Sequence, residues 1–157
     1  MNVISRDRNG TAIFAERSQR NLDYITICAT NDHDVHPVTQ AVLSLLGIVV
    51  FPWETSAFDI VKTRKLPVLT ANGWPHWEMY GPKRVIDLRD LVHVLRNAIA
   101  HGKIEFDSDS RDPSAVTITF SNLPEGTSEP NWIGRITGNQ LIEFCRCFSS
   151  AIRHQVQ

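Results

Sequence analysis

One stretch, from Lys83 to His101, constrains the fold of this chain more than any other feature of the sequence. Its apolar residues at positions 85, 88, 92, 95 and 99 recur every three or four residues, which is the spacing of one face of an amphipathic α-helix. Gly102 follows directly, and glycine is the residue that most often ends a helix. The pattern therefore predicts a helix over 83–101 that buries one face against a core.

The sequence before this helix predicts two further helices and an irregular segment. Residues 1–10 are polar and are expected to form a flexible tail, and apolar spacing predicts a first helix over 11–28. A second helix is expected over 37–51, because Pro52 cannot continue it. Residues 53–82 are rich in tryptophan and proline and are expected to form an ordered, aromatic-anchored excursion.

The sequence after Gly102 predicts a small sheet and a last helix. Three short alternating runs between residues 103 and 136, separated by turn-forming residues, predict an antiparallel β-meander. Thr137 followed by Gln140 is a capping box and opens a helix that is expected to end near Arg153. The fold class predicted is mainly α: one helical-bundle domain over 11–157 with the β insert placed before the last helix.

Composition limits the classes of function. The chain has 157 residues, which is the length of one domain, and its net charge is −1. A nonspecific duplex binder normally carries a strong basic excess, so any nucleic-acid chemistry must come from a local site. Because no apolar run approaches the roughly 18 residues of a membrane span, we expect no membrane association.

The cysteines indicate a reducing compartment. There are three, Cys28, Cys145 and Cys147, so they cannot all pair within one chain. Disulfides are rare in the cytosol, and we therefore expect a cytoplasmic protein. Cys145 is expected to pack in the core. No cysteine spacing typical of zinc sites occurs.

The polar face of the 83–101 helix carries unusual residues for a solvated surface. Such faces are ordinarily filled with Glu and Lys, whereas this one presents Arg89, His93, Arg96, Asn97 and His101. Asn97 and His101 are four residues apart and so share a face. Two of the five side chains can change protonation near neutral pH.

These residue types fit the cleavage of RNA without a metal. A histidine can take the proton from a ribose 2′-hydroxyl and so make it a nucleophile on the adjacent phosphate. A neighbouring arginine can stabilise the charge that builds on the phosphoryl oxygens, and an asparagine can position the phosphate or orient an imidazole. We expect neither a metal nor another cofactor.

The segment Leu95-Arg96-Asn97-Ala98-Ile99-Ala100-His101-Gly102 resembles the signature of HEPN domains: an arginine, a polar residue, three further residues and a histidine near the end of a long helix. The segment 38–54, ending in Phe-Pro-Trp-Glu, and the β insert before the last helix are similar to a plasmid and bacterial HEPN subfamily. Together the resemblance covers residues 11–153.

The resemblance implies a helical bundle that forms a homodimer, with two such motifs facing each other across one cleft. Many HEPN proteins are ribonucleases of toxin–antitoxin, phage-defence or RNA-processing systems. Carried over by position, Arg96 and His101 would be the catalytic pair and Asn97 the polar helper. Arg89 and His93 share the polar stripe of the helix and are candidates for substrate binding or, equally, for packing against a dimer mate or the tryptophans. The expected partners are RNA, a second copy of the chain, and an antitoxin or regulatory protein.

Other interpretations stay open at this point. Arg96, Asn97 and His101 could cap the helix and tie its end to the β insert. The chain could then be a noncatalytic dimeric module that binds a partner, RNA or a nucleotide. A metalloenzyme using His33 and His36 is a third reading, although two histidines without further ligands are a poor metal signal. Trp53, Trp74 and Trp77 could stack bases or simply anchor an irregular segment.

Overall fold

The computed structural model describes residues 3–53, 59 and 61–154. Within them the elements are, in chain order, α1 (Val3–Thr30), α2 (Pro37–Trp53), α3 (Leu66–Ala71), β1 (Glu78–Tyr80), α4 (Leu88–Ala100), β2 (Ile104–Phe106), the short 3-10 helix η1 (Pro113–Ala115), β3 (Thr117–Asn122), β4 (Trp132–Thr137) and α5 (Gly138–Arg153). The predicted class, mainly α with a small antiparallel sheet before the last helix, is confirmed.

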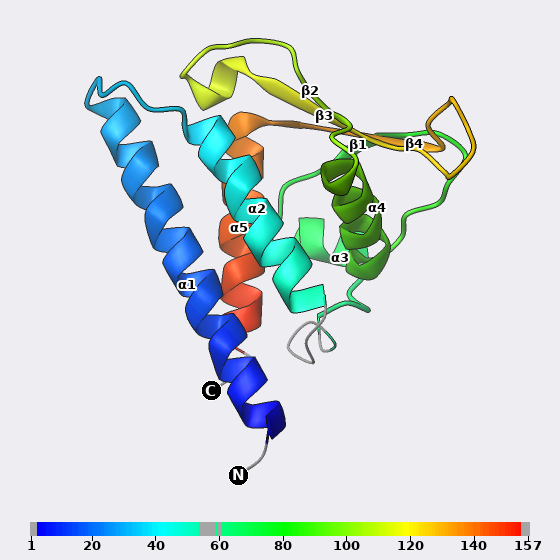
Figure 1. Cartoon of the computed structure of the whole chain (residues 1–157), viewed down its shortest axis with the longest axis horizontal. Coiled ribbons are helices and arrows are strands. Elements are labelled where there is room, and N and C mark those ends of the chain that lie inside the picture. The colour runs from blue at the N-terminus through cyan, green and yellow to red at the C-terminus, as the bar shows by residue number, and fades with distance from the viewer. Residues whose placement is uncertain (1–2, 54–58, 60, 155–157) are drawn as a thin grey trace.

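Two layers build the molecule. Helices α1, α2 and α5 pack on one another as a bundle, and α4 packs against α2 and against strand β3. Figure 1 shows the sheet lying across one end of this bundle, with α4 and α5 beneath it. The first turns of α1 and the last turns of α5 lie at the end away from the sheet. No helix within the described residues combines the length and the apolar character needed to cross a bilayer.

The sheet contains the three predicted strands and one that the sequence did not indicate. Its order is β1-β4-β3-β2 and every pair is antiparallel, so β2, β3 and β4 form the expected meander. Burial alternates along β3 and β4, as a sheet with one face on the core requires. Strand β1 pairs with β4 from the 53–82 segment, and its three residues are too few for a period to be seen.

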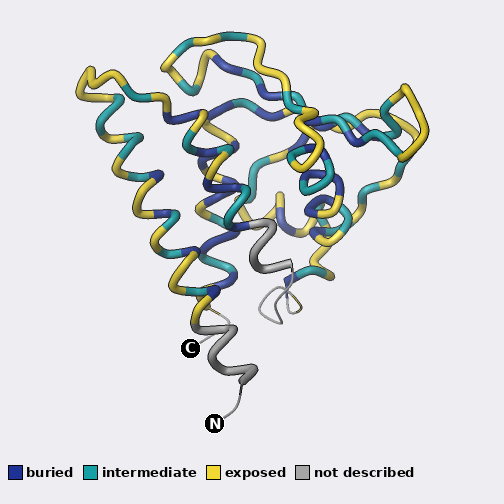
Figure 2. The backbone as a smooth tube through the Cα atoms, in the orientation of Figure 1, coloured by how far each residue is buried: buried dark blue, intermediate teal, exposed yellow. Residues whose placement is uncertain are grey.

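Helix α4 is shorter than predicted at its start and close to its predicted end. It begins at Leu88, because Asp87 has an extended backbone and its side chain accepts a hydrogen bond from the Asp90 N–H at 3.0 Å. The Asp90 carboxylate in turn accepts one from the Ile86 N–H at 3.1 Å. The predicted buried stripe is confirmed by full burial of Leu88, Val92 and Leu95, as Figure 2 shows for this part of the chain.

Helix α1 differs from its prediction in two ways. It begins at Val3, so that residues 3–10, which the sequence assigned to a flexible tail, belong to the helix. Its buried stripe contains Thr11, Ala15, Gln19 and Leu22, whereas the larger Ile13, Phe14, Tyr24 and Ile27 are exposed. The packing of α1 against α2 and α5 therefore decides which face of α1 turns inward.

Helices α2 and α5 follow the sequence more closely. Helix α2 begins at Pro37 as predicted and continues two residues past the predicted end at 51. At α5 the capping box between Thr137 and Gln140 is present, and its inward face lies in the core. Trp74 and Trp77 also pack against that core, so they anchor the segment between α2 and α4. Trp53 has a side chain outside the described part of the structure.

We predict that the cap at Asp87 stabilises the start of α4. Asp87→Ala should lower the free energy of unfolding by about 1 kcal/mol, measured by urea denaturation at a fixed protein concentration. Asp87→Asn should keep most of that stability, because an amide oxygen can still accept from the Asp90 N–H. Asp109→Ala, in an exposed loop, is the control. Equal losses for the alanine and asparagine variants would show that the cap is not the cause.

Candidate functional site

The site residues predicted from the sequence lie along the outward face of α4. Arg89 is in the first turn, His93 in the middle, and Arg96 and Asn97 in the last turns of the helix. His101 is the C-cap residue, and its backbone N–H donates to the Asn97 carbonyl at 3.1 Å. Four of the five residues thus lie on one rigid helix, and the fifth, His101, follows its last turn.

A glycine turn fixes the end of the helix directly after His101. Gly102 has φ +63, a left-handed conformation that glycine adopts without steric cost. Its N–H donates to the Ile99 carbonyl at 3.1 Å, and the Lys103 N–H donates to the Ala98 carbonyl at 2.8 Å, which together form a Schellman motif. The motif sets the backbone of His101, whose side chain is exposed.

The side-chain amide of Asn97 contacts His93, one helical turn before it. Its amide nitrogen lies 3.3 Å from His93 Nε2 and 3.1 Å from Asn122 Oδ1. Because an amide nitrogen only donates, both contacts use its protons, and His93 Nε2 must accept. Of the two roles that the sequence left open for Asn97, orienting an imidazole is therefore the one seen, and that imidazole belongs to His93 rather than His101.

The hydrogen bonds continue into the β3–β4 hairpin. Asn122, which is only 5% exposed, donates from its own amide nitrogen to Asn131 Oδ1 at 2.6 Å. The Asn131 carbonyl accepts from the Lys83 N–H at 3.0 Å, and a side chain at Gly81 would meet that same oxygen at 2.5 Å. We call Asn97, Asn122 and Asn131 the amide chain. No sequence pattern marks Asn122 and Asn131 as site residues, since asparagines near a turn are ordinary turn residues.

The surroundings of His93 favour its neutral form. Burial is the largest cause that holds its pKa below the usual value, followed by the positive charges of Lys83 and Arg96, while Asp90 acts in the opposite direction. A neutral imidazole that accepts at Nε2 carries its proton on Nδ1.

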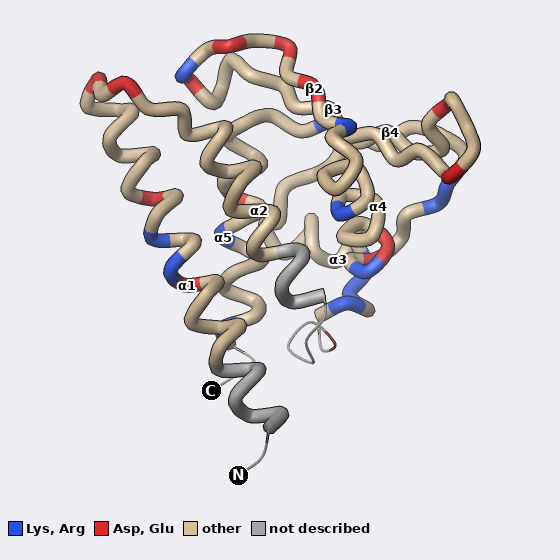
Figure 3. Tube along the Cα trace, viewed as in Figure 1, with Lys and Arg blue, Asp and Glu red and all other residues tan. Residues whose placement is uncertain are grey.

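Charge is unevenly distributed along the chain. Eight of the 16 Lys and Arg residues lie between residues 62 and 103, together with only three of the 17 acidic residues, so this segment carries +5 in a chain of net −1. Figure 3 shows the basic positions along α4 and its flanking segments, whereas acidic positions gather in the loops between α1 and α2 and between β2 and β3. The segment that contains α4 is therefore basic, which favours an anionic ligand there.

The remaining histidines and two of the cysteines show neither a metal site nor an activated thiol among the described residues. Among the described residues, no three His, Cys, Asp or Glu side chains lie where they could share a metal ion, which includes the exposed His33 and His36. Cys145 is buried as predicted, and burial raises the pKa of its thiol to about 12. Burial, followed by the nearby Glu143 carboxylate, also raises the pKa of Cys147. Neither thiol has the lowered pKa of a reactive nucleophile.

The bundle, the late β insert and the Arg96–His101 motif at the end of α4 are the features of a HEPN protein. A family model described as HEPN pEK499 p136 matches residues 1–157, and the chain belongs to this family. HEPN domains commonly dimerise and bind RNA, and the superfamily accommodates nucleases and nucleotide-binding modules. Neither the curated proteins nor the solved structures contain a significant match to the chain.

We predict that the amide chain contributes to the low pKa of His93. In Asn97→Ala the neutral imidazole loses its hydrogen bond at Nε2, so the pKa of His93 should rise toward its usual value, as measured by NMR titration of the ring. Burial and the charges of Lys83 and Arg96 remain, so the rise should be partial. Asn139→Ala, an exposed asparagine on α5, is the control and should leave the titration unchanged. A pKa that stays constant in Asn97→Ala would contradict the role assigned to the amide.

Proposed function

We propose that this protein is a metal-independent RNA endonuclease of HEPN type that acts as a toxin or phage-defence component. The observation that carries the proposal is the placement of Arg96 and His101 on the last turn and cap of α4, within the segment 62–103 that carries a net charge of +5. His101 is exposed and Arg96 half-buried, so an RNA strand can reach the imidazole without rearrangement of the core.

The proposed chemistry is an attack of the ribose 2′-oxygen on the adjacent phosphorus. One imidazole accepts the 2′-hydroxyl proton, the bond from phosphorus to the 5′-oxygen breaks, and a protonated imidazole gives that oxygen its proton. The products are a 2′,3′-cyclic phosphate and a free 5′-hydroxyl, and no water or metal is consumed. In a homodimer the second copy of His101 would supply the second imidazole, and Arg96 would stabilise the developing phosphoryl charge.

Arg89 and His93 are proposed to bind the substrate. The exposed Arg89 lies two helical turns before Arg96, and the exposed His93 lies between them on the same helix. Lys83 stands beside His93 and extends the same surface. A strand following α4 would therefore meet basic or donor groups along the length of the helix.

One observation favours a second candidate, a noncatalytic dimeric module that binds RNA or a regulatory partner. Both amide protons of Asn97 are used inside the protein, toward His93 and Asn122, so this residue ties α4 to the hairpin. A motif residue with that role is compatible with a purely structural function of the helix end. Cleavage assays separate this candidate from the first.

The decisive experiment is cleavage of a mixed RNA pool in EDTA. Wild-type protein should produce ends that carry 2′,3′-cyclic phosphate. His101→Ala should lower the rate by about 10²–10⁴-fold, the usual contribution of a general acid–base group, and Arg96→Ala by about 10²–10³-fold, the usual cost of losing one donor that stabilises transition-state charge. Arg17→Ala on α1 and His33→Ala in the α1–α2 turn are the matched controls and should retain full activity. Intact RNA from a verified dimer would favour the noncatalytic module.

The basic segment should make RNA binding salt-dependent in a residue-specific way. For single strands, the slope of log affinity against log salt changes by about 0.7 for each phosphate that a cation neutralises. In a His101→Ala background, Lys83→Ala and Arg89→Ala should each reduce the magnitude of this slope by about 0.7, measured by fluorescence anisotropy with a labelled oligonucleotide. Arg17→Ala should leave it unchanged, and a uniform effect of all three would argue against a localised surface.

A further inference from the structure

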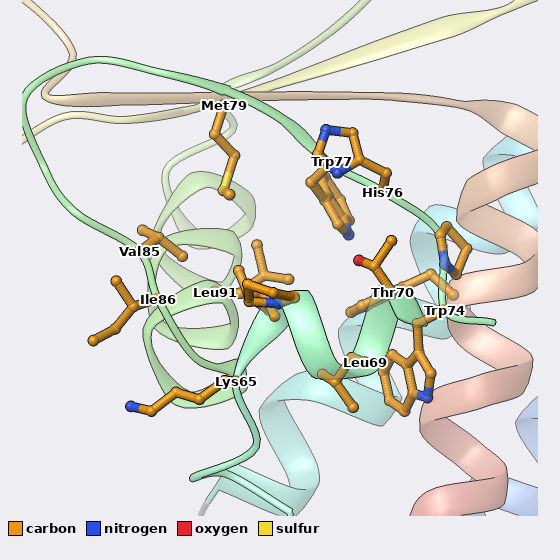
Figure 4. A pocket seen from close by; sticks show the side chains of 14 residues that line it. Lys65, Leu69, Thr70, Trp74, His76, Trp77, Met79, Val85, Ile86 and Leu91 are labelled. Atoms are coloured by element: carbon orange, nitrogen blue, oxygen red, sulfur yellow. The ribbon is translucent and has the colours of Figure 1, made fainter. Parts of the chain in front are cut away.

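A cavity lies away from the polar face of α4. It has a volume of about 610 Å³, within the range of small-molecule sites. Its walls come from α3, the chain around Trp74–Met79, the residues before α4, and one residue each of α4 and α5. Figure 4 shows Val85, Ile86 and Leu91 on one side and Trp74 and Trp77 on the other.

The aromatic wall is held rigidly. Phe144 of α5 contacts Trp77 edge to face, with ring centroids 5.4 Å apart, and contacts Trp74 in the same manner at 5.6 Å. Trp77 also meets Phe120 of the sheet at 5.7 Å. Phe144 and Phe120 both belong to the core. The wall formed by Trp74 and Trp77 is therefore preformed and does not need to be assembled by a ligand.

One polar atom in this wall has no partner. Trp77 is only 4% exposed, and no acceptor among the described residues takes a hydrogen bond from its indole nitrogen Nε1. Figure 4 shows this nitrogen on the side of the ring that points toward Thr70, another residue of the cavity. A buried donor without a partner costs on the order of 1–3 kcal/mol, and an acceptor brought by a ligand would recover that cost.

We propose that this cavity binds a small, planar, mostly apolar aromatic molecule that carries one neutral acceptor, a carbonyl oxygen or a ring nitrogen, which takes a hydrogen bond from Trp77 Nε1. The apolar walls select the aromatic body, and the single buried donor selects the acceptor. A nucleobase is a poorer occupant, because its edge carries several polar atoms and the lining of the cavity is mostly apolar. This site is independent of the proposed ribonuclease activity.

The test compares quinoline with naphthalene, two ligands of the same shape of which only quinoline has a ring nitrogen. Dissociation constants are measured by ligand-observed NMR on the full chain at pH 7.5, for the wild type and for Trp77→Phe. The ratio of the two constants should shift by about tenfold against quinoline in Trp77→Phe. The ratio cancels the different hydrophobicity of the two ligands.

Two further variants test the cavity itself by changing exposed residues of α3 and leaving the hydrophobic core unchanged. Thr70→Phe places a large ring at an exposed lining position and should weaken both ligands at least tenfold, whereas Val68→Phe, exposed on the same helix but outside the cavity, should change neither. Binding of neither ligand to the wild type, an unchanged ratio in a folded Trp77→Phe, or equal effects of Thr70→Phe and Val68→Phe would each overturn the proposal.

Discussion

Burial of one face of α4 is the constraint on which the rest of the structure depends. Leu88, Val92 and Leu95 lose all contact with solvent between α2 and the sheet, and each such side chain contributes about 2 kcal/mol of hydrophobic stabilisation. A helix that is held this firmly on one side must present its other side to solvent. The polar residues from Arg89 to His101 therefore share one outward surface, whatever their function.

The amide chain adds directional contacts to this nondirectional packing. Its three asparagines join α4, the β3–β4 hairpin and the loop before α4 by hydrogen bonds in which every contact pairs one donor with one acceptor. Because Asn122 is buried, loss of a hydrogen bond in the amide chain would leave polar groups without partners, which is costly away from water. Asn97 and His93 are therefore held in place by hydrogen bonds within the fold. His101 follows the last turn of the helix, and its exposed side chain is accessible to a ligand.

Basic and acidic residues lie in different parts of the molecule. The segment that contains α4 is basic, and the acidic residues lie mainly in loops at the ends of other elements, where Arg111 approaches the carboxylates of Asp32 and Asp34. A net charge of −1 thus conceals a basic segment whose charge suits an anionic polymer. The apolar cavity between α3 and α4 is separate from the polar face of α4 and differs from it in chemistry, so the fold offers two distinct environments on either side of one helix.

The sequence alone determined the features that depend on neighbouring residues. The stripe of α4, the alternation of β3 and β4, the capping box at Thr137 and the HEPN motif are all local patterns, because helical and strand periods and caps act over a few residues. Only the tertiary structure decided the rest. The burial of Thr11 and Ala15 in place of Ile13 depends on how closely α1 approaches its neighbours, and β1 exists because β4 offers an edge to pair with. The partners of Asn97 lie up to 25 residues away in the chain, and no local pattern can specify a hydrogen bond that the packing of a helix on a hairpin creates.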